Sequence, residues 1–181
     1  MGMRKRAFLF CALAACALAV SAQSYSLRSN ILGLATTNLN LEASMTLNRK
    51  WSLHLPVQYN PFKFGSNRQF RNFYAAPGAR YWLLESYMGG FIGMYGTAGM
   101  YSVGNLFGSK YRYEGEGYGV GLSVGKAYQI GRRWNLEWEV GAGAVWLAYD
   151  KYLCKRCGDL VDSDYGWHFL PTRAALNLVY L

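Results

Sequence analysis

The feature that most constrains this chain is a long alternation of apolar and polar residues with a period of two. Across residues 39–47 every odd position is apolar and every even position is polar. In the segment 134–149 the alternation runs for sixteen residues, whereas strands of globular proteins usually have about five or six. Because side chains of a strand point alternately to its two faces, this pattern predicts long, half-buried strands.

Eight strands are predicted in all, in an all-β chain. The hairpins of residues 39–47 with 51–59 and of residues 118–130 with 134–149 are the clearest, and the other four strands are placed at 26–35, 73–84, 90–101 and 167–181. Short turns are expected at 36–38, 48–50, 84–89 and 130–133, and long connections at 60–72, 102–114 and 150–166. An even strand number with short turns at one end and long loops at the other is typical of outer-membrane barrels.

The first 22 residues have the organisation of a signal peptide. Three basic residues, Arg4, Lys5 and Arg6, precede an apolar run over 7–20 and a small-residue cleavage site that ends at Ala22. We therefore expect a signal peptide at 1–22 and one mature domain at 23–181. The sequence Leu13-Ala14-Ala15-Cys16 also matches a lipoprotein processing box that would acylate Cys16, but the apolar run continues past it.

Past the leader, no apolar stretch approaches the ~18 consecutive residues of a spanning helix. A membrane location therefore requires a closed barrel, because only a barrel satisfies its backbone groups without helices. Removal of the leader takes three of the 19 basic residues and none of the 10 acidic ones, leaving a net charge of +6. The charge and location favour lipid and lipopolysaccharide phosphates as neighbours over nucleic acid. The sequence thus predicts a closed antiparallel up-and-down transmembrane β-barrel in the outer membrane of a Gram-negative bacterium.

The charged residues of the predicted strands are expected to point into the barrel. They alternate with Trp, Leu, Val and Met, which can contact acyl chains. A lumen of about eight strands is just wide enough for side chains to fill it, and an unpaired charge there would cost several kcal/mol. We therefore predict a plugged lumen with a charge network formed by Glu42, His54, Arg80, Glu137, Glu139 and Arg173. Ten aromatic residues are expected in two interfacial girdles, namely Trp51, Tyr59, Phe73, Tyr74, Tyr81, Trp82, Trp134, Trp146, Tyr149 and Tyr180.

The pair Cys154 and Cys157 forms a CxxC motif in the longest predicted loop. A disulfide is favoured, since an exported protein resides in an oxidising compartment. Half of a zinc site and a redox pair are the alternatives. A zinc site would need further ligands, and His54 and His168 are the two histidines of the chain. We predict no bound metal and no cofactor.

Two groups of residues could perform catalysis. Glu137 and Glu139 lie two apart and face the same way, as acid–base pairs on sugars require, although salt bridges to lumen arginines explain them without a substrate. His168 follows Asp162, Ser163 and Asp164, so a triad of a lipid-modifying enzyme could form at the rim. No serine is singled out as a nucleophile in a strained turn between a strand and a helix. We assign no catalytic residue.

A basic and aromatic segment follows the 51–59 strand. Lys63, Arg68 and Arg71 alternate there with phenylalanines. These cations could bind lipopolysaccharide phosphates or a surface glycan, and the alternative is an exposed loop that folds onto the rim. The phenylalanines are Phe62, Phe64, Phe70 and Phe73.

The residues also carry a family resemblance that covers nearly all of the mature chain. The segments concerned are Ser29-Asn30-Ile31-Leu32, Leu39-Asn40-Leu41-Glu42, Trp51-Ser52-Leu53, Tyr59-Asn60-Pro61-Phe62, Arg80-Tyr81-Trp82-Leu83, Arg132-Arg133-Trp134-Asn135-Leu136-Glu137, Tyr149-Asp150-Lys151-Tyr152 and the loop 154–158. Together they resemble a Bacteroidota family of small outer-membrane barrels of unknown function. The resemblance implies an eight-stranded barrel and, for members encoded beside fimbrillin genes, an association with surface fimbriae. It implies no catalytic residues.

From these observations we expect a structural, adhesive or surface-assembly role, with fimbrial or other surface proteins as partners. A lipid- or lipopolysaccharide-modifying enzyme with a site at the extracellular rim is the first alternative. A narrow channel is the second.

Overall fold

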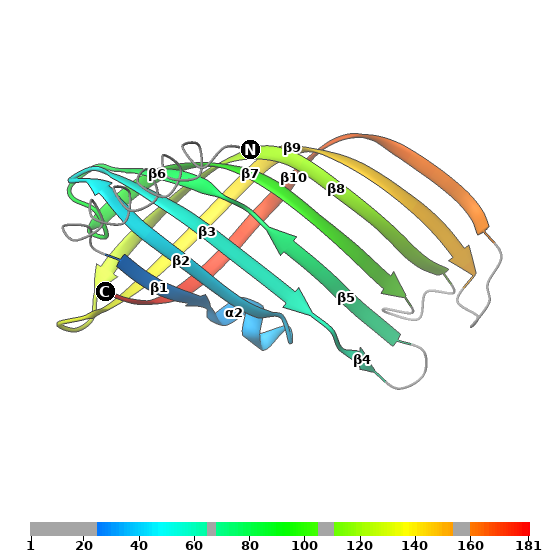
Figure 1. Ribbon diagram of the computed structural model, residues 1–181, viewed down its shortest axis with the longest axis horizontal. Coiled ribbons are helices and arrows are strands. Elements are labelled where there is room, and N and C mark those ends of the chain that lie inside the picture. The colour runs from blue at the N-terminus through cyan, green and yellow to red at the C-terminus, as the bar shows by residue number, and fades with distance from the viewer. Residues whose placement is uncertain (1–24, 65–67, 105–110, 154–159) are drawn as a thin grey trace, which may run out of the picture.

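The computed structural model describes residues 25–64, 68–104, 111–153 and 160–181, which form one antiparallel sheet and a short helix (Figure 1). The signal-peptide prediction and the predicted Cys154–Cys157 disulfide both fall outside the described residues. The elements in chain order are β1 (Tyr25–Asn30), α2 (Ile31–Ala35), β2 (Leu39–Asn48), β3 (Trp51–Asn60), β4 (Lys63–Phe64), β5 (Arg68–Ala75), β6 (Gly78–Trp82), β7 (Gly89–Gly104), β8 (Tyr111–Gln129), β9 (Trp134–Leu153) and β10 (Leu160–Tyr180).

The sheet closes into a barrel. Its strand order is β2-β1-β10-β9-β8-β7-β6-β3-β5-β4, and an additional pairing of β2 with β3 completes the ring. β5 and β6 both lie between β3 and β7, so they are two halves of one wall strand, while β4 pairs with β5 beyond the wall. The predicted closed antiparallel barrel of eight strands is thereby confirmed. In the described part of the chain, no helix has the length and apolar character needed to cross a membrane.

Several predicted boundaries are wrong. The strand expected at 26–35 ends at Asn30, and α2 follows it. The Asn30 side chain caps this helix by accepting a hydrogen bond from the Leu32 N–H at 3.1 Å, which is the usual role of Asn before a first helical turn. The predicted long connections are also shorter, because β5, β8, β9 and β10 extend into them. A β-ladder depends on backbone pairing and not on the side-chain pattern, so these strands continue past the residues where apolar alternation stops.

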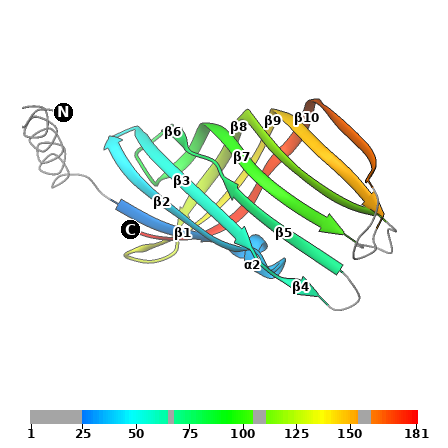
Figure 2. The same ribbon diagram turned by 45° about the vertical axis from the view of Figure 1, so that its right-hand side comes forward.

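The barrel is much taller on one side than on the other (Figure 1, Figure 2). The beginning of β1 and the end of β10 are paired at one end, which we call the terminal end. β7, β8, β9 and β10 project beyond β1 and β2 at the opposite end. β1 pairs with β10 only from Asn177 to Tyr180. From residue 160 to 176, β10 has β9 on one side and no strand of the described chain on the other.

The distribution of side chains is inverted relative to a water-soluble domain. Charged and amide side chains fill the lumen, with Arg28, Glu137 and Asn177 all at most 2% exposed. Large apolar side chains cover the outside of every wall strand, as at Leu41, Leu55, Met94, Leu122, Val140 and Tyr180. Alternation along each strand therefore separates an apolar exterior from a polar interior.

The aromatic residues occupy three kinds of position. Trp51 pairs with Tyr81 and Trp134 with Tyr180 on the outside near the terminal end, with ring centroids 5.3 and 5.1 Å apart. Trp146 contacts Trp167 at 5.7 Å much farther along the wall. The predicted girdle position of Trp82 is wrong, because this side chain is fully buried in the lumen. The alternation carried the signal for this burial, because Trp82 lies two residues after Arg80 and so shares its inward face.

Candidate functional site

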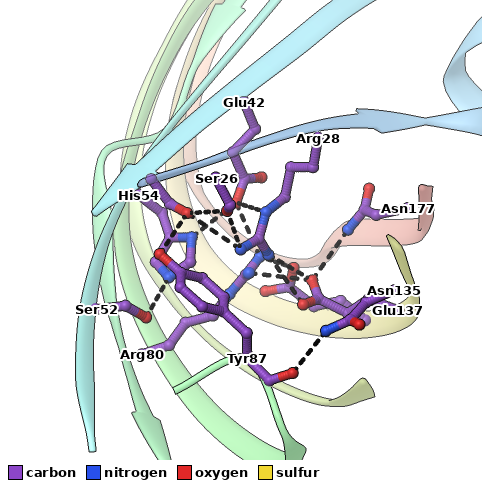
Figure 3. A network of polar contacts seen from close by, with 12 residues as sticks. Ser26, Arg28, Glu42, Ser52, His54, Arg80, Tyr87, Asn135, Glu137 and Asn177 are labelled. Carbon is purple, nitrogen blue, oxygen red and sulfur yellow. Dashed lines mark hydrogen bonds and ion pairs between the residues drawn. The ribbon is translucent and has the colours of Figure 1, made fainter. Parts of the chain in front are cut away.

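An ion-pair ring occupies the lumen near the terminal end (Figure 3). Going round the ring, Arg28 contacts Glu137 at 2.7 Å, Glu137 contacts Arg80 at 3.0 Å, and Arg80 contacts Glu139 at 2.5 Å. Arg173 then contacts Glu139 at 2.9 Å and Glu42 at 2.5 Å, and Glu42 closes the ring on Arg28 at 3.4 Å. Three guanidinium groups alternate with three carboxylates. The ring is therefore electrically balanced.

The six members reach the ring from five strands of the wall. Glu42 comes from β2, Arg28 from β1 and Arg173 from β10, while Glu137 and Glu139 share the inner face of β9. Arg80 on β6 crosses the lumen to meet all three carboxylates, including Glu42 at 3.1 Å. Burial strengthens these attractions. It also means that removal of one partner would leave an unpaired buried charge, which is strongly destabilising.

The structure brings together the six residues predicted for the lumen network: Glu42, His54, Arg80, Glu137, Glu139 and Arg173. Sequence reasoning missed Arg28, which donates to both oxygens of Glu137 at 2.7 and 2.9 Å. The signal was present, because Arg28 and Ser26 alternate with the outward Tyr25 and Leu27.

A chain of hydrogen bonds leads from Glu42 into the wall. His54 Nδ1 lies 2.9 Å from Glu42 Oε1, and His54 Nε2 lies 2.7 Å from Ser52 Oγ. The indole N–H of Trp82 donates to Ser52 Oγ at 2.7 Å. The order Ser–His–Glu resembles that of a hydrolase triad. However, Ser52 has no exposed surface, so an acyl group has no path to its oxygen.

Below the ring, the turn of residues 83–88 closes the terminal end of the lumen. Tyr87 adopts a positive φ of 68°, which turns its side chain inward against Trp82 with ring centroids 5.7 Å apart. Its hydroxyl lies 3.0 Å from Ser44 Oγ, and its carbonyl accepts a hydrogen bond from Asn135. Trp82, Tyr87, Phe91 and Ala127 form a buried apolar cluster, which we call the aromatic floor.

The two catalytic arrangements considered as alternatives from the sequence do not match the geometry found. Glu137 is saturated by Arg28, Arg80 and Asn177 and is 1% exposed, which leaves no room for a sugar. His168 lies on the same extended strand as Asp162, and six residues of a strand span about 20 Å. The Asp162 and Asp164 carboxylates instead accept hydrogen bonds from the N–H groups of the residues that follow them.

The basic segment forms part of a hairpin at the opposite end. Lys63 lies in β4, and Arg68 and Arg71 lie in β5. The backbones of β4 and β5 pair, so this segment is an ordered extension of the wall rather than the predicted loop. Arg71 is exposed, whereas the side chains of Lys63 and Arg68 are outside the described part of the molecule.

Residues 25–64, 68–104, 111–153 and 160–181 contain no group of three or more His, Cys, Asp or Glu side chains placed to hold a metal ion. The carboxylates of the ring are instead neutralised by arginines.

A comparison with known protein families identifies the family of this chain. A family described as a protein of unknown function, DUF3575, matches residues 7–181. The chain belongs to the DUF3575 family. The match covers all the described residues of this family member, including every member of the ion-pair ring. No curated protein and no solved structure matches the chain significantly.

Proposed function

We propose that this DUF3575 protein is an outer-membrane barrel that does not conduct and that serves as a structural or adhesive scaffold for surface assembly. The observation that carries the proposal is the inverted barrel. An apolar exterior suits lipid, and the pairings of β2 with β3 and of β1 with β10 close the antiparallel ring, as a spanning sheet requires. The buried, balanced charges inside give the barrel a rigid interior rather than a transport path.

The closed lumen argues against the channel alternative. The aromatic floor and the ion-pair ring lie across the same end of the lumen, and their side chains are almost fully buried. Ions would have to displace Trp82 or separate buried ion pairs. In planar lipid bilayers, the mature protein is therefore expected to give no stable conductance steps. Reproducible steps from the purified wild-type barrel would overturn this part of the proposal.

The projecting strands support a role at the cell surface. β8, β9 and β10 extend past the shorter side of the barrel, and aromatic side chains such as Tyr165, Trp167 and Phe169 are 61–79% exposed there. Exposed aromatic side chains of this kind favour contacts with other molecules. We propose fimbrial or other surface proteins as the partners, with lipopolysaccharide around the barrel.

Deletion of the gene in its own bacterium separates this role from transport. We expect fewer surface fibres by electron microscopy, or weaker adhesion, with unchanged uptake of small solutes, and restoration by the wild-type gene. Unchanged fibres and adhesion together with reduced solute uptake would assign transport instead.

The hydrogen-bonded Ser52–His54–Glu42 chain is an observation that favours an enzyme. A fluorophosphonate probe tests it directly, because such probes modify activated serines. We expect no labelling of Ser52 in the folded barrel, since its hydroxyl is buried beneath Trp82. Labelling that is lost in His54→Ala, with the folded mobility of the barrel retained, would establish a catalytic serine.

A further inference from the structure

Resting on the proposed membrane location, we propose that the upper lumen binds the acyl chain of a membrane lipid, which enters sideways over the short wall formed by β1, α2 and β2. Three features carry this inference: an internal cavity above the ion-pair ring, a discontinuity in the wall beside it, and the apolar character of the surfaces between them.

The cavity has a volume of about 330 Å³, which lies at the lower end of the range for small-molecule sites, about 300–1,000 Å³. Its lining includes the inward-facing Gly99, Gly117, Val145, Leu147 and Leu170. Glycine matters at position 117, where a Cβ would lie 2.6 Å from the Leu147 side chain. Gln58, Asn72 and Thr97 also line the cavity, but most of its lining is apolar, in contrast to the charged ring below it.

A polar partition separates the cavity from the ring. Tyr95 Oη lies 2.6 Å from Thr172 Oγ1, and the Arg173 guanidinium stacks over the Tyr95 ring at 5.5 Å. The Tyr95 ring occupies the space over Gly121, where a Cβ would come within 2.6 Å of it. An apolar chain in the cavity would therefore rest on the Tyr95–Thr172 contact without separating any ion pair.

The wall next to the cavity is open on one side. Leu170, Pro171 and Thr172 of β10 line the cavity, and at these positions β1 no longer pairs with β10. The Asn30 side chain satisfies the last backbone groups at the end of the β1 pairing, donating to the Ala174 carbonyl and accepting from the Leu176 N–H. Pro171 has no N–H, which suits a position on an unpaired edge. Polar side chains such as Asn40, Gln58 and Arg173 line the gap lower down, between β2 and residues 172–177 of β10. The apolar part of the opening therefore lies above them, beside Leu170 and Pro171.

The short wall itself presents apolar side chains. α2 packs against both β10 and β2, and its Ile31, Leu32 and Leu34 are 41–49% exposed. These residues continue the apolar exterior up to the rim. A lipid beside the barrel can thus pass from the outer surface over α2 and beside Leu170 into the cavity. This route and the mainly apolar lining are the reason to commit to an acyl chain as the occupant.

Photocrosslinking in vesicles tests the proposal. The mature protein is refolded into phosphatidylcholine vesicles that contain a phosphatidylcholine with a diazirine at the end of one acyl chain. After illumination, mass spectrometry locates the adducts. We expect adducts on the inward Val145, Leu147 and Leu170 in addition to outward residues such as Val120 and Leu122. Adducts confined to outward residues would overturn the inference.

A matched pair of variants checks that inward adducts arise in the cavity. Leu170→Trp fills the cavity and should abolish adducts at Val145 and Leu147, while outward adducts persist and report a folded barrel. The control Phe169→Trp changes the neighbouring outward side chain, which is 79% exposed, and should leave the inward adducts unchanged. Persistence of inward adducts in Leu170→Trp would contradict the cavity. A complete absence of adducts would instead overturn the membrane location, and this inference with it.

Discussion

Glu137→Gln is expected to lower the free energy of unfolding of the barrel by about 3–5 kcal/mol, the range for breaking a buried ion pair. Glu137 accepts from Arg28 at 2.7 Å, Arg80 at 3.0 Å and Asn177 at 3.2 Å, and it is 1% exposed. Glutamine keeps the shape but removes the charge, so the ring retains three buried guanidinium groups against two carboxylates. The measurement is urea unfolding in detergent, followed by the loss of the folded mobility on unheated gels.

The exposed pair of Arg49 and Glu85 provides a matched control. Its atoms are as close as 2.5 Å, but the side chains are 87% and 54% exposed. Exposed ion pairs contribute about 0–1 kcal/mol, so Glu85→Gln should leave the urea midpoint nearly unchanged. Equal midpoints for the Glu137 and Glu85 variants would show that the ring does not stabilise the barrel.

Trp82→Ala should be comparably destabilising, by about 3–5 kcal/mol, as found when a buried aromatic side chain is truncated. Trp82 has no exposed surface, packs against Tyr87 and Phe91 and donates a hydrogen bond to Ser52. Its removal would leave a void in the aromatic floor and take away the indole N–H donor of Ser52, whose hydroxyl would keep its contact with His54. The same urea unfolding experiment gives the change in stability.

Two further variants separate packing from hydrogen bonding. Trp82→Phe retains most of the apolar volume and loses the hydrogen bond to Ser52, so a loss of about 1 kcal/mol is expected. Trp134→Ala removes an outward indole that is 44% exposed, and its effect should be smaller than that of Trp82→Ala. The assignment of Trp82 to the floor is wrong if the Trp134 variant is the less stable of the two alanine variants.

Much of the wall follows from sequence pattern alone. A period of two places every second side chain on the same face, so the inward direction of Glu42, Glu137 and Arg80 could be predicted without coordinates. Arg28 obeys the same rule and was missed only because its strand is six residues long and weakly patterned. Strand ends were less predictable, since β8 and β10 continue through polar segments where backbone pairing alone maintains the ladder.

The sequence by itself determined a closed antiparallel barrel with an apolar exterior and a charged interior, because alternation is a local property of the chain. It did not determine which carboxylate meets which arginine, since Arg28 and Glu137 lie 109 positions apart and their contact depends on strand register and closure. Nor did it place Trp82 and Tyr87 in the floor, which requires the positive φ of a tight turn. The unequal height of the wall was likewise decided by tertiary structure, because it depends on where β1 stops pairing with β10.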